Sequence, residues 1–174
     1  MLYQYVGPAK IKAAVAGDDS GVSVTRADVL LAWAGEQDEW EGEVLTVTFV
    51  VVEDGTLRIA PQRSEHVACA RGGPVLAAGE LMLARQPDLA IIGVSNQSTG
   101  YCPDPGCWEA AHEAFVALGI PCPEALTQAY TFRLCPNCGE RNLVKDGWFE
   151  CDLCGHALPR AWNFAAQSKR EEGA

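Results

Sequence analysis

Basic residues and long apolar runs are the two features that this sequence has least of. Its 174 residues include 13 Lys and Arg against 23 Asp and Glu, which gives a formal net charge of −10. No segment approaches the ~18 uninterrupted apolar residues of a membrane-spanning helix, and the start, MLYQYVGPAKIK, lacks the apolar stretch of a signal peptide. We therefore expect no membrane partner. The cysteine usage described below favours the reducing cytoplasm over a secreted disulfide scaffold.

The net negative charge comes entirely from the larger, N-terminal part of the chain. Residues 1–129 contain seven Lys and Arg and seventeen Asp and Glu, whereas residues 130–174 contain six of each. An acidic surface repels phosphate backbones, so we do not expect the main domain to bind nucleic acid. Such a contact would have to come from the neutral C-terminal part, which offers four cationic side chains: Arg133, Arg141, Lys145 and Arg160.

The strongest motif is a pair of Cys-x2-Cys segments in the C-terminal part. The two segments are separated by twelve residues. The second cysteine of each segment is followed by a glycine, Gly139 or Gly155, at the position where a metal-binding turn needs a positive φ. This spacing is typical of a tetrahedral, all-thiolate zinc site. The sequence therefore predicts a structural zinc ribbon that binds one Zn²⁺ and leaves no open position for catalysis. Its ligands are Cys135, Cys138, Cys151 and Cys154.

Two other uses of cysteine compete with this interpretation. The ribbon cysteines could instead form two disulfides. A second metal site could be assembled from Cys102, Cys107, His112 and Cys122, although their spacing matches no ribbon or finger pattern. We expect Cys69, Cys102, Cys107 and Cys122 to be free thiols.

The rest of the chain predicts an α+β domain, in which an antiparallel sheet of hairpins packs against a helix. Residues 44–52 alternate in polarity and turn at Asp54-Gly55 into residues 56–60, which indicates a β-hairpin. A short helix is expected before it, within residues 25–35, and a longer one follows Asp104 and ends at Gly119. We place the α+β domain at residues 1–130, the ribbon with its docking segment at 131–165, and a disordered tail at 166–174.

A second hairpin is predicted over residues 65–83, with Gly72-Gly73-Pro74 as its loop. In that register His66 faces Glu80 across the hairpin, and a further strand at residues 90–97 sets Gly93 beside Glu80. The pair is either an acid–base couple or an ordinary cross-strand contact. Ser98 and Tyr101 precede the longer helix, where they either help to bind an anion or form a hydroxyl-rich turn that caps the helix.

The segment from His66 to Pro103 resembles a domain of plant IQ-motif proteins and of bacterial toxin-associated proteins. The resemblance rests on His66, Gly72, Gly73, Ala77, Ala78, Gly79, Ser98, Tyr101 and Pro103. Two serines of that pattern are replaced by Val67 and Ala68, and a second histidine is replaced by Gly100. The resemblance implies a shared fold and a shared pocket, and the lost polar residues weaken any catalytic inference. The arrangement with a C-terminal ribbon is also similar to uncharacterised bacterial cytoplasmic proteins.

Two functions follow as hypotheses. The first is a cytoplasmic, non-enzymatic binding or adaptor protein that has another protein as its partner and a structural zinc ribbon. The alternative is an enzyme or small-ligand receptor with a pocket for an anionic or nucleotide-like ligand. That pocket would be lined by His66, Glu80, Ser98 and Tyr101.

Overall fold

The chain folds into two compact units, Met1–Ala129 and Tyr130–Ala174, which we call the N-terminal unit and the ribbon unit. The structure is a computed structural model that describes residues 1–18, 20–85 and 88–164. The predicted tail at residues 166–174 lies outside the described residues. Within the described residues, no helix combines the length and the apolar character needed to span a membrane.

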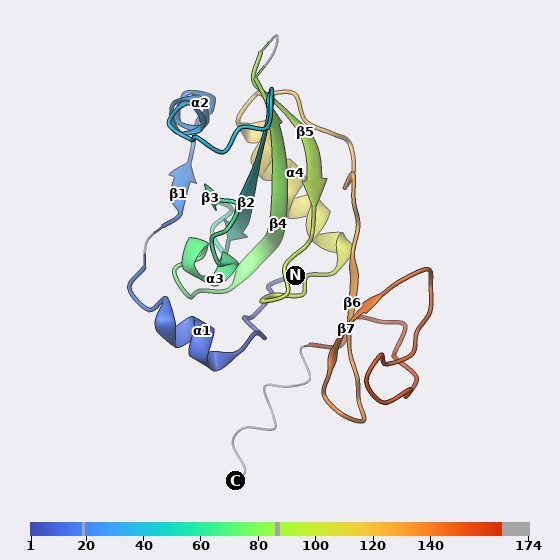
Figure 1. The fold of residues 1–174 in the computed structure, drawn as a ribbon. Coiled ribbons are helices and arrows are strands. Elements are labelled where there is room, and N and C mark those ends of the chain that lie inside the picture. Colours follow the sequence, from blue (N-terminus) through green and yellow to red (C-terminus); the bar gives the residue numbers. More distant parts are fainter. Residues whose placement is uncertain (19, 86–87, 165–174) are drawn as a thin grey trace. The chain divides into compact units, whose positions relative to one another are not determined.

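The N-terminal unit is built on a five-stranded antiparallel sheet, which confirms the predicted α+β class (Figure 1). The strands lie in the order β1-β3-β2-β4-β5, so the central strand β2 pairs with β3 on one side and with β4 on the other. The elements are α1 Ala9–Ala14, β1 Val22–Val24, α2 Ala27–Gly35, β2 Val44–Val52, β3 Leu57–Pro61, α3 His66–Cys69, β4 Val75–Ala84, β5 Ala90–Ser95, the 3₁₀ turn η1 Pro105–Cys107 and α4 Trp108–Ala117.

The main core lies between the sheet and α4, which covers the back of the sheet in Figure 1. Phe115 of α4 and Phe49 of β2 are both fully buried, and their rings meet edge to face with centroids 5.6 Å apart. Helix α3 covers part of the opposite face. It is held there by the buried Arg58 of β3, which donates a hydrogen bond to the carbonyl of Cys69, the last residue of α3. The predicted hairpin of β2 and β3 is confirmed.

The second predicted hairpin is wrong. Residues 66–69 form helix α3, and the strand that follows, β4, pairs with β2 and β5 instead. Part of the signal for this helix is local, because Ala68 favours a helix and Gly72, just beyond its end, is free to adopt the positive φ of 75° that it has here. The Gly72 N–H donates to the carbonyl of Val67 and closes that turn.

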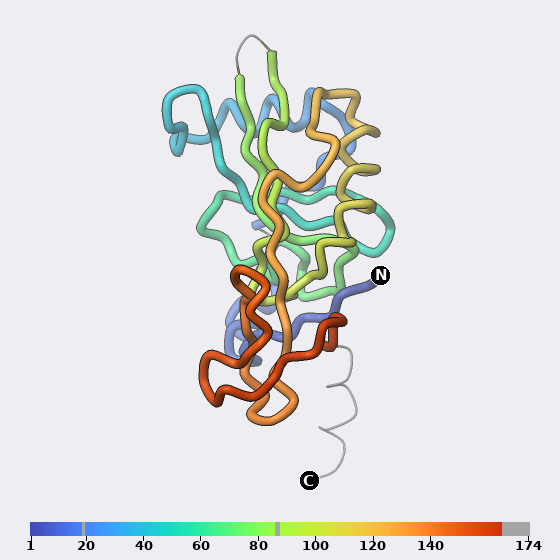
Figure 2. Tube along the Cα trace, turned by 90° about the vertical axis from the view of Figure 1, so that its right-hand side faces the viewer, coloured from blue at the N-terminus to red at the C-terminus, as the bar shows by residue number. Residues whose placement is uncertain are grey.

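The register of β5 also differs from the prediction. Glu80 pairs with Ser95, while Gly93 pairs with Met82. The pair Ala84–Ala90 is already shifted by one residue from the predicted register, and an irregularity between Met82 and Leu83 adds a second. The glycine at which two backbones approach is Gly79, since a Cβ there would lie 1.8 Å from the carbonyl oxygen of Ser95. The outer edge of β5 is covered by a later segment, whose Gln128 bridges to Ser95; this segment runs along the strands in Figure 2.

The ribbon unit contains one two-stranded antiparallel sheet, β6 Thr131–Leu134 and β7 Arg141–Val144. A second, shorter pairing joins Glu150 to Ala157. The segment after it is fixed to β6 by Asn163, whose side chain accepts a hydrogen bond from the Leu134 N–H and donates one to the Leu134 carbonyl.

Candidate metal centre

Each Cys-x2-Cys segment forms a tight turn, or knuckle, at the end of a strand pair. In the first knuckle, the Cys135 N–H donates to the carbonyl of Glu140 at 2.8 Å, and the Gly139 N–H donates to the carbonyl of Cys135 at 3.0 Å. Gly139 has a φ of 77°, a conformation that is strained for any residue with a Cβ. The glycine after the second cysteine is therefore needed to close the turn.

The second knuckle repeats these bonds sixteen residues later. The Cys151 N–H donates to the carbonyl of His156 at 2.8 Å, and the Gly155 N–H donates to the carbonyl of Cys151 at 2.9 Å. Gly155 has a φ of 69°. The flanking pairs correspond as well, since Leu134–Arg141 and Glu150–Ala157 are related by the same offset. The two knuckles are thus two copies of one local structure.

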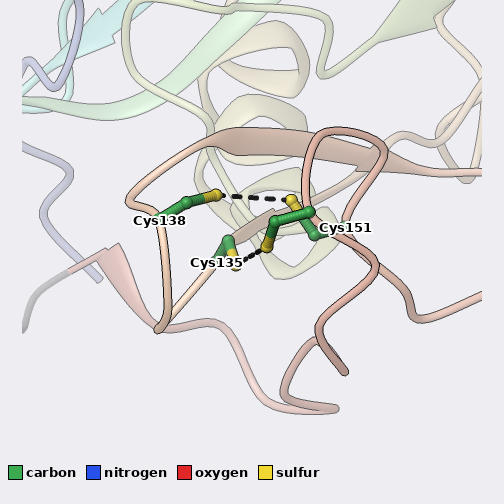
Figure 3. Close-up of side chains that lie close together, drawn as sticks. Cys135, Cys138 and Cys151 are labelled. Atoms are coloured by element: carbon green, nitrogen blue, oxygen red, sulfur yellow. Dashed lines mark hydrogen bonds between the residues drawn. The ribbon is translucent and has the colours of Figure 1, made fainter.

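The two knuckles bring four sulfur atoms to one point. The Sγ atoms of all four ribbon cysteines lie within 4.8 Å of one another. The Cys135–Cys154 and Cys138–Cys151 sulfurs are each 3.6 Å apart, and Figure 3 shows the thiols directed into one shared space. Four sulfurs bound at ~2.3 Å in a tetrahedron would be about 3.8 Å apart. The arrangement fits a metal ion.

The same distances argue against the disulfide interpretation. A disulfide requires an S–S distance of about 2.05 Å, whereas the two sulfur contacts stated above are each 3.6 Å, and all eight cysteines are free. Each of these contacts also joins one knuckle to the other. The geometry therefore matches four separate thiolate ligands.

Two of the ligands lie in an environment that favours the thiolate. The pKa of Cys154 is lowered to about 6, chiefly because the side-chain amide of Asn137 donates a hydrogen bond to its sulfur at 3.5 Å. For Cys151, burial raises the pKa, but hydrogen bonds from the backbone of Cys154 and Leu153 outweigh it and the net shift is downward. A thiolate is the form that binds a metal ion.

The surroundings of the cluster are apolar on one side and open on the other. Cys135, Cys151 and Leu158 form a small buried core, against which Val144 and Phe149 pack. Cys138 and Cys154 are exposed. The centre is therefore anchored by one buried cysteine of each knuckle and reached from solvent through the other.

Two residues of the predicted pocket, His66 and Glu80, do not face each other across a hairpin. His66 lies on α3, not on a strand opposite Glu80, and its Nε2 is 2.9 Å from the carbonyl oxygen of Gly79. Glu80 is half-buried on β4 between Thr48 and Ser95. The imidazole thus approaches the backbone beside Glu80 rather than facing its side chain as a strand partner.

Ser98 and Tyr101 lie next to each other and are almost completely buried. The Tyr101 N–H donates to Ser98 Oγ at 3.4 Å, and the Tyr101 hydroxyl donates to the carbonyl of Gly73 at 2.6 Å. Burial raises the pKa of Tyr101, so the hydroxyl stays protonated and remains a donor. These polar groups hold the loop before α4 against the turn after α3.

The other cysteines do not gather into a second centre. Within residues 1–18, 20–85 and 88–164, the ribbon cysteines are the one group of three or more metal-ligating side chains that lie together. Cys102 instead donates to the carbonyl of Thr99. Burial raises the pKa of the Cys107 thiol to about 12, so this sulfur is a poor nucleophile at neutral pH.

Comparison with known proteins adds no relative to this description. No family model matches the chain, and no curated protein or solved structure is significantly similar to it. The resemblance of residues 66–103 to plant IQ-motif and toxin-associated domains therefore stays a prediction. The function has to be argued from the four-cysteine centre and from the surface around it.

Proposed function

We propose that the chain is a zinc-binding adaptor protein, in which one Zn²⁺ is a structural ion of the ribbon unit. The observation that carries the proposal is the cluster of four Sγ atoms within 4.8 Å. Soft thiolate donors favour zinc, copper(I) and iron among biological metals. Paired knuckles with four thiolates are typical of structural zinc, because all four tetrahedral positions are taken by protein ligands.

The adaptor role is supported by the surface next to the metal centre. Trp148 and Leu153 are 65% and 70% exposed, although they belong to the apolar classes that folding normally buries. Leu153 lies inside the second knuckle, and Trp148 lies just before it. Tryptophan is enriched among residues that contribute most to protein–protein binding. The metal-binding turn presents Leu153, and the segment that leads into it presents Trp148, so the two side chains offer a contact for another protein.

The cytoplasmic location belongs to the same proposal. Free thiols persist in a reducing compartment, whereas oxidising compartments convert neighbouring cysteines to disulfides. The ribbon cysteines have to remain reduced to bind zinc. Cell fractionation followed by alkylation of free thiols would test this, and a protein found oxidised in a secretory compartment would contradict it.

Elemental analysis of the full-length protein tests the metal. We expect about one zinc per chain after purification without added metal. Cys138→Ser should lose the ion, whereas Cys122→Ser, which changes a half-buried cysteine outside the cluster, should retain it. Iron in place of zinc, or equal metal content in both variants, would contradict the proposal.

Quantitative affinity purification from the native cell tests the adaptor role. The expected result is a partner protein that is recovered with the wild type and lost with Trp148→Ala or Leu153→Ser. Leu31→Ser is the matched control, because Leu31 is also an exposed apolar residue, 56% exposed, but lies on α2 in the N-terminal unit. A protein lost equally from all three variants would not be a ribbon partner.

The ligand-binding alternative around His66, Glu80, Ser98 and Tyr101 stays a prediction. Its test is the binding of anionic and nucleotide-like ligands to the wild type and to His66→Ala and Ser98→Ala. Binding that is lost in both variants, in proteins that retain their fold, would favour a receptor over an adaptor.

A further inference from the structure

Two of the positions at which the knuckles differ concern the same hydrogen bond. In the second knuckle, the residue after the first cysteine is Asp152, and its backbone N–H donates to Asn142 Oδ1 at 2.9 Å. The residue related to Asp152 by the sixteen-residue offset is Pro136, which has no N–H to donate. The donor that requires a partner in one knuckle is missing from the other.

The acceptor side follows the same pattern. Asn142 is 3% exposed, and its counterpart under the same offset is Leu158, which is 5% exposed and packs on Cys135 and Cys151. A buried amide is costly unless it is hydrogen-bonded, and a buried N–H without an acceptor is costly too. The first knuckle therefore has Pro136, and Leu158 stands where an acceptor would be. The second knuckle has the Asp152 N–H, and Asn142 accepts its hydrogen bond.

The amide of Asn142 also reaches the first knuckle. Its Nδ2 donates at 2.9 Å to the carbonyl of Glu140, which accepts the N–H of Cys135 as well. One side chain thus connects the base of the first knuckle to the turn that holds Cys151 and Cys154. Metal affinity is higher when the ligands already have their binding geometry before the ion arrives. A bridge that fixes one knuckle against the other should therefore raise the affinity of the centre.

From this geometry we infer that Asn142 is a positioning residue of the metal centre. Its side chain holds the second knuckle at the distance from the first knuckle that tetrahedral binding requires. Asn142 does not touch the ion; it acts through the Asp152 N–H. The inference rests on the proposed zinc site. It also gives a reason for a buried amide at a position whose counterpart is leucine.

The test is a set of four full-length proteins: the wild type, Asn142→Leu, Asp152→Pro and the double variant. Zinc affinity is measured by competition with a chromophoric chelator. The visible spectrum after substitution with Co²⁺ reports whether the thiolates remain tetrahedral. We expect Asn142→Leu to lower zinc affinity by ~10–100-fold, the usual effect of removing a group that orients metal ligands, and to change the cobalt spectrum.

The double variant gives the decisive measurement. Asp152→Pro removes the N–H that Asn142→Leu leaves without an acceptor, and so reproduces in the second knuckle the combination of proline and leucine that the first knuckle has. We expect it to bind zinc about tenfold more tightly than Asn142→Leu alone. A double variant that binds no better than Asn142→Leu, even if that single variant fails to fold, would overturn the inference. So would an Asn142→Leu protein with the affinity and spectrum of the wild type.

Asn163→Leu is the matched control. The side-chain amide of Asn163 also makes two hydrogen bonds to the backbone, one as acceptor and one as donor. Both are to Leu134, and neither is to the second knuckle. We expect a lower unfolding temperature with an unchanged cobalt spectrum, and an equal change in both asparagine variants would argue for a general packing effect. A wild type that binds no zinc would instead contradict the proposed function, so the two failures are distinguishable.

Discussion

Apolar side chains fill the interior of the N-terminal unit, whereas two of the few buried side chains in the ribbon unit are metal ligands. Between the sheet and α4, large residues such as Phe49, Leu81 and Phe115 have no measurable or almost no exposure. In the ribbon unit the described buried apolar residues are Phe132, Leu134, Cys135, Cys151, Leu158 and Phe164. A unit of this size buries too little apolar surface to be stable by that means alone. We therefore expect two different sources of stability in one chain: burial of apolar side chains in the N-terminal unit and metal binding in the ribbon unit.

Metal removal is expected to have the largest effect and to separate the two units. Cys138→Ser, or treatment with a strong chelator, should unfold residues 130–164 and leave the N-terminal unit folded. Structural zinc in such sites supplies about 10–16 kcal/mol of apparent binding energy, which is also folding energy. The measurement is a ¹H–¹⁵N NMR spectrum, in which the ribbon signals should collapse while those of β2 and β4 persist. Loss of both sets would show one cooperative unit.

Truncation of the core should produce the opposite result. Phe115→Ala removes a ring that is fully buried against Phe49, and we expect it to lower the free energy of unfolding of the N-terminal unit by ~3–5 kcal/mol. Zinc content should not change. Val116→Ala is the control, because Val116 is 56% exposed on the same helix and should shift stability by less than ~0.5 kcal/mol. Loss of zinc in Phe115→Ala would show that the ribbon depends on this core.

The difference between the units also decided what the sequence could predict. The knuckles and the hairpin of β2 and β3 are local structures, and their signals lie within a few residues: cysteine spacing with a trailing glycine, and alternation with an Asp54-Gly55 turn. The pairing of β4 with β2 joins two strands that are separated in the sequence by β3 and α3, and the residues of neither strand identify its partner. The sequence before Gly72 is therefore predicted to pair with its nearest neighbour, the strand after Pro74, and this prediction is wrong.

The same distinction applies within the metal centre. The four ligands follow from spacing alone, whereas the bridge from Asn142 to Asp152 depends on how the two knuckles face each other. One signal was nevertheless present in the sequence. The first Cys-x2-Cys segment contains Pro136 where the second contains Asp152, so one backbone donor is missing from an otherwise repeated motif. The importance of this donor becomes clear only from the structure, which shows Asn142 as its acceptor.

A smaller effect is expected when a polar group is removed from the N-terminal unit. Tyr101→Phe deletes the hydroxyl that donates to the carbonyl of Gly73 at 2.6 Å, and we expect a loss of about 1–3 kcal/mol in the free energy of unfolding. Tyr5→Phe is the control, because its hydroxyl makes a longer, 3.4 Å bond to Pro8 in an exposed setting. Chemical denaturation of both variants gives the comparison. Equal losses would show that burial of the bond around Tyr101 contributes nothing.

The smallest predicted effect is a dependence of the N-terminal unit on pH through His66. Burial lowers the pKa of this imidazole below 6.5, although the hydrogen bond to the Gly79 carbonyl partly opposes the shift. That bond requires Nε2 to carry the proton, so the folded protein holds the neutral ring with Nε2 as donor. The unfolded chain binds a second proton below pH ~6.5, while the folded chain resists it.

Stability should therefore be constant with respect to His66 above pH ~6.5 and should fall as the pH is lowered from there toward the folded-state pKa. The slope cannot exceed about 1.4 kcal/mol per pH unit, the limit for one proton. His66→Gln stays neutral throughout, so the difference in unfolding free energy between wild type and variant should shrink or reverse on acidification. Denaturation followed by NMR signals of β2 and β4 makes the measurement independent of the metal centre, whose thiolates also take up protons in acid. A difference that does not vary between pH 5 and 8 would show that the imidazole titrates alike in both states.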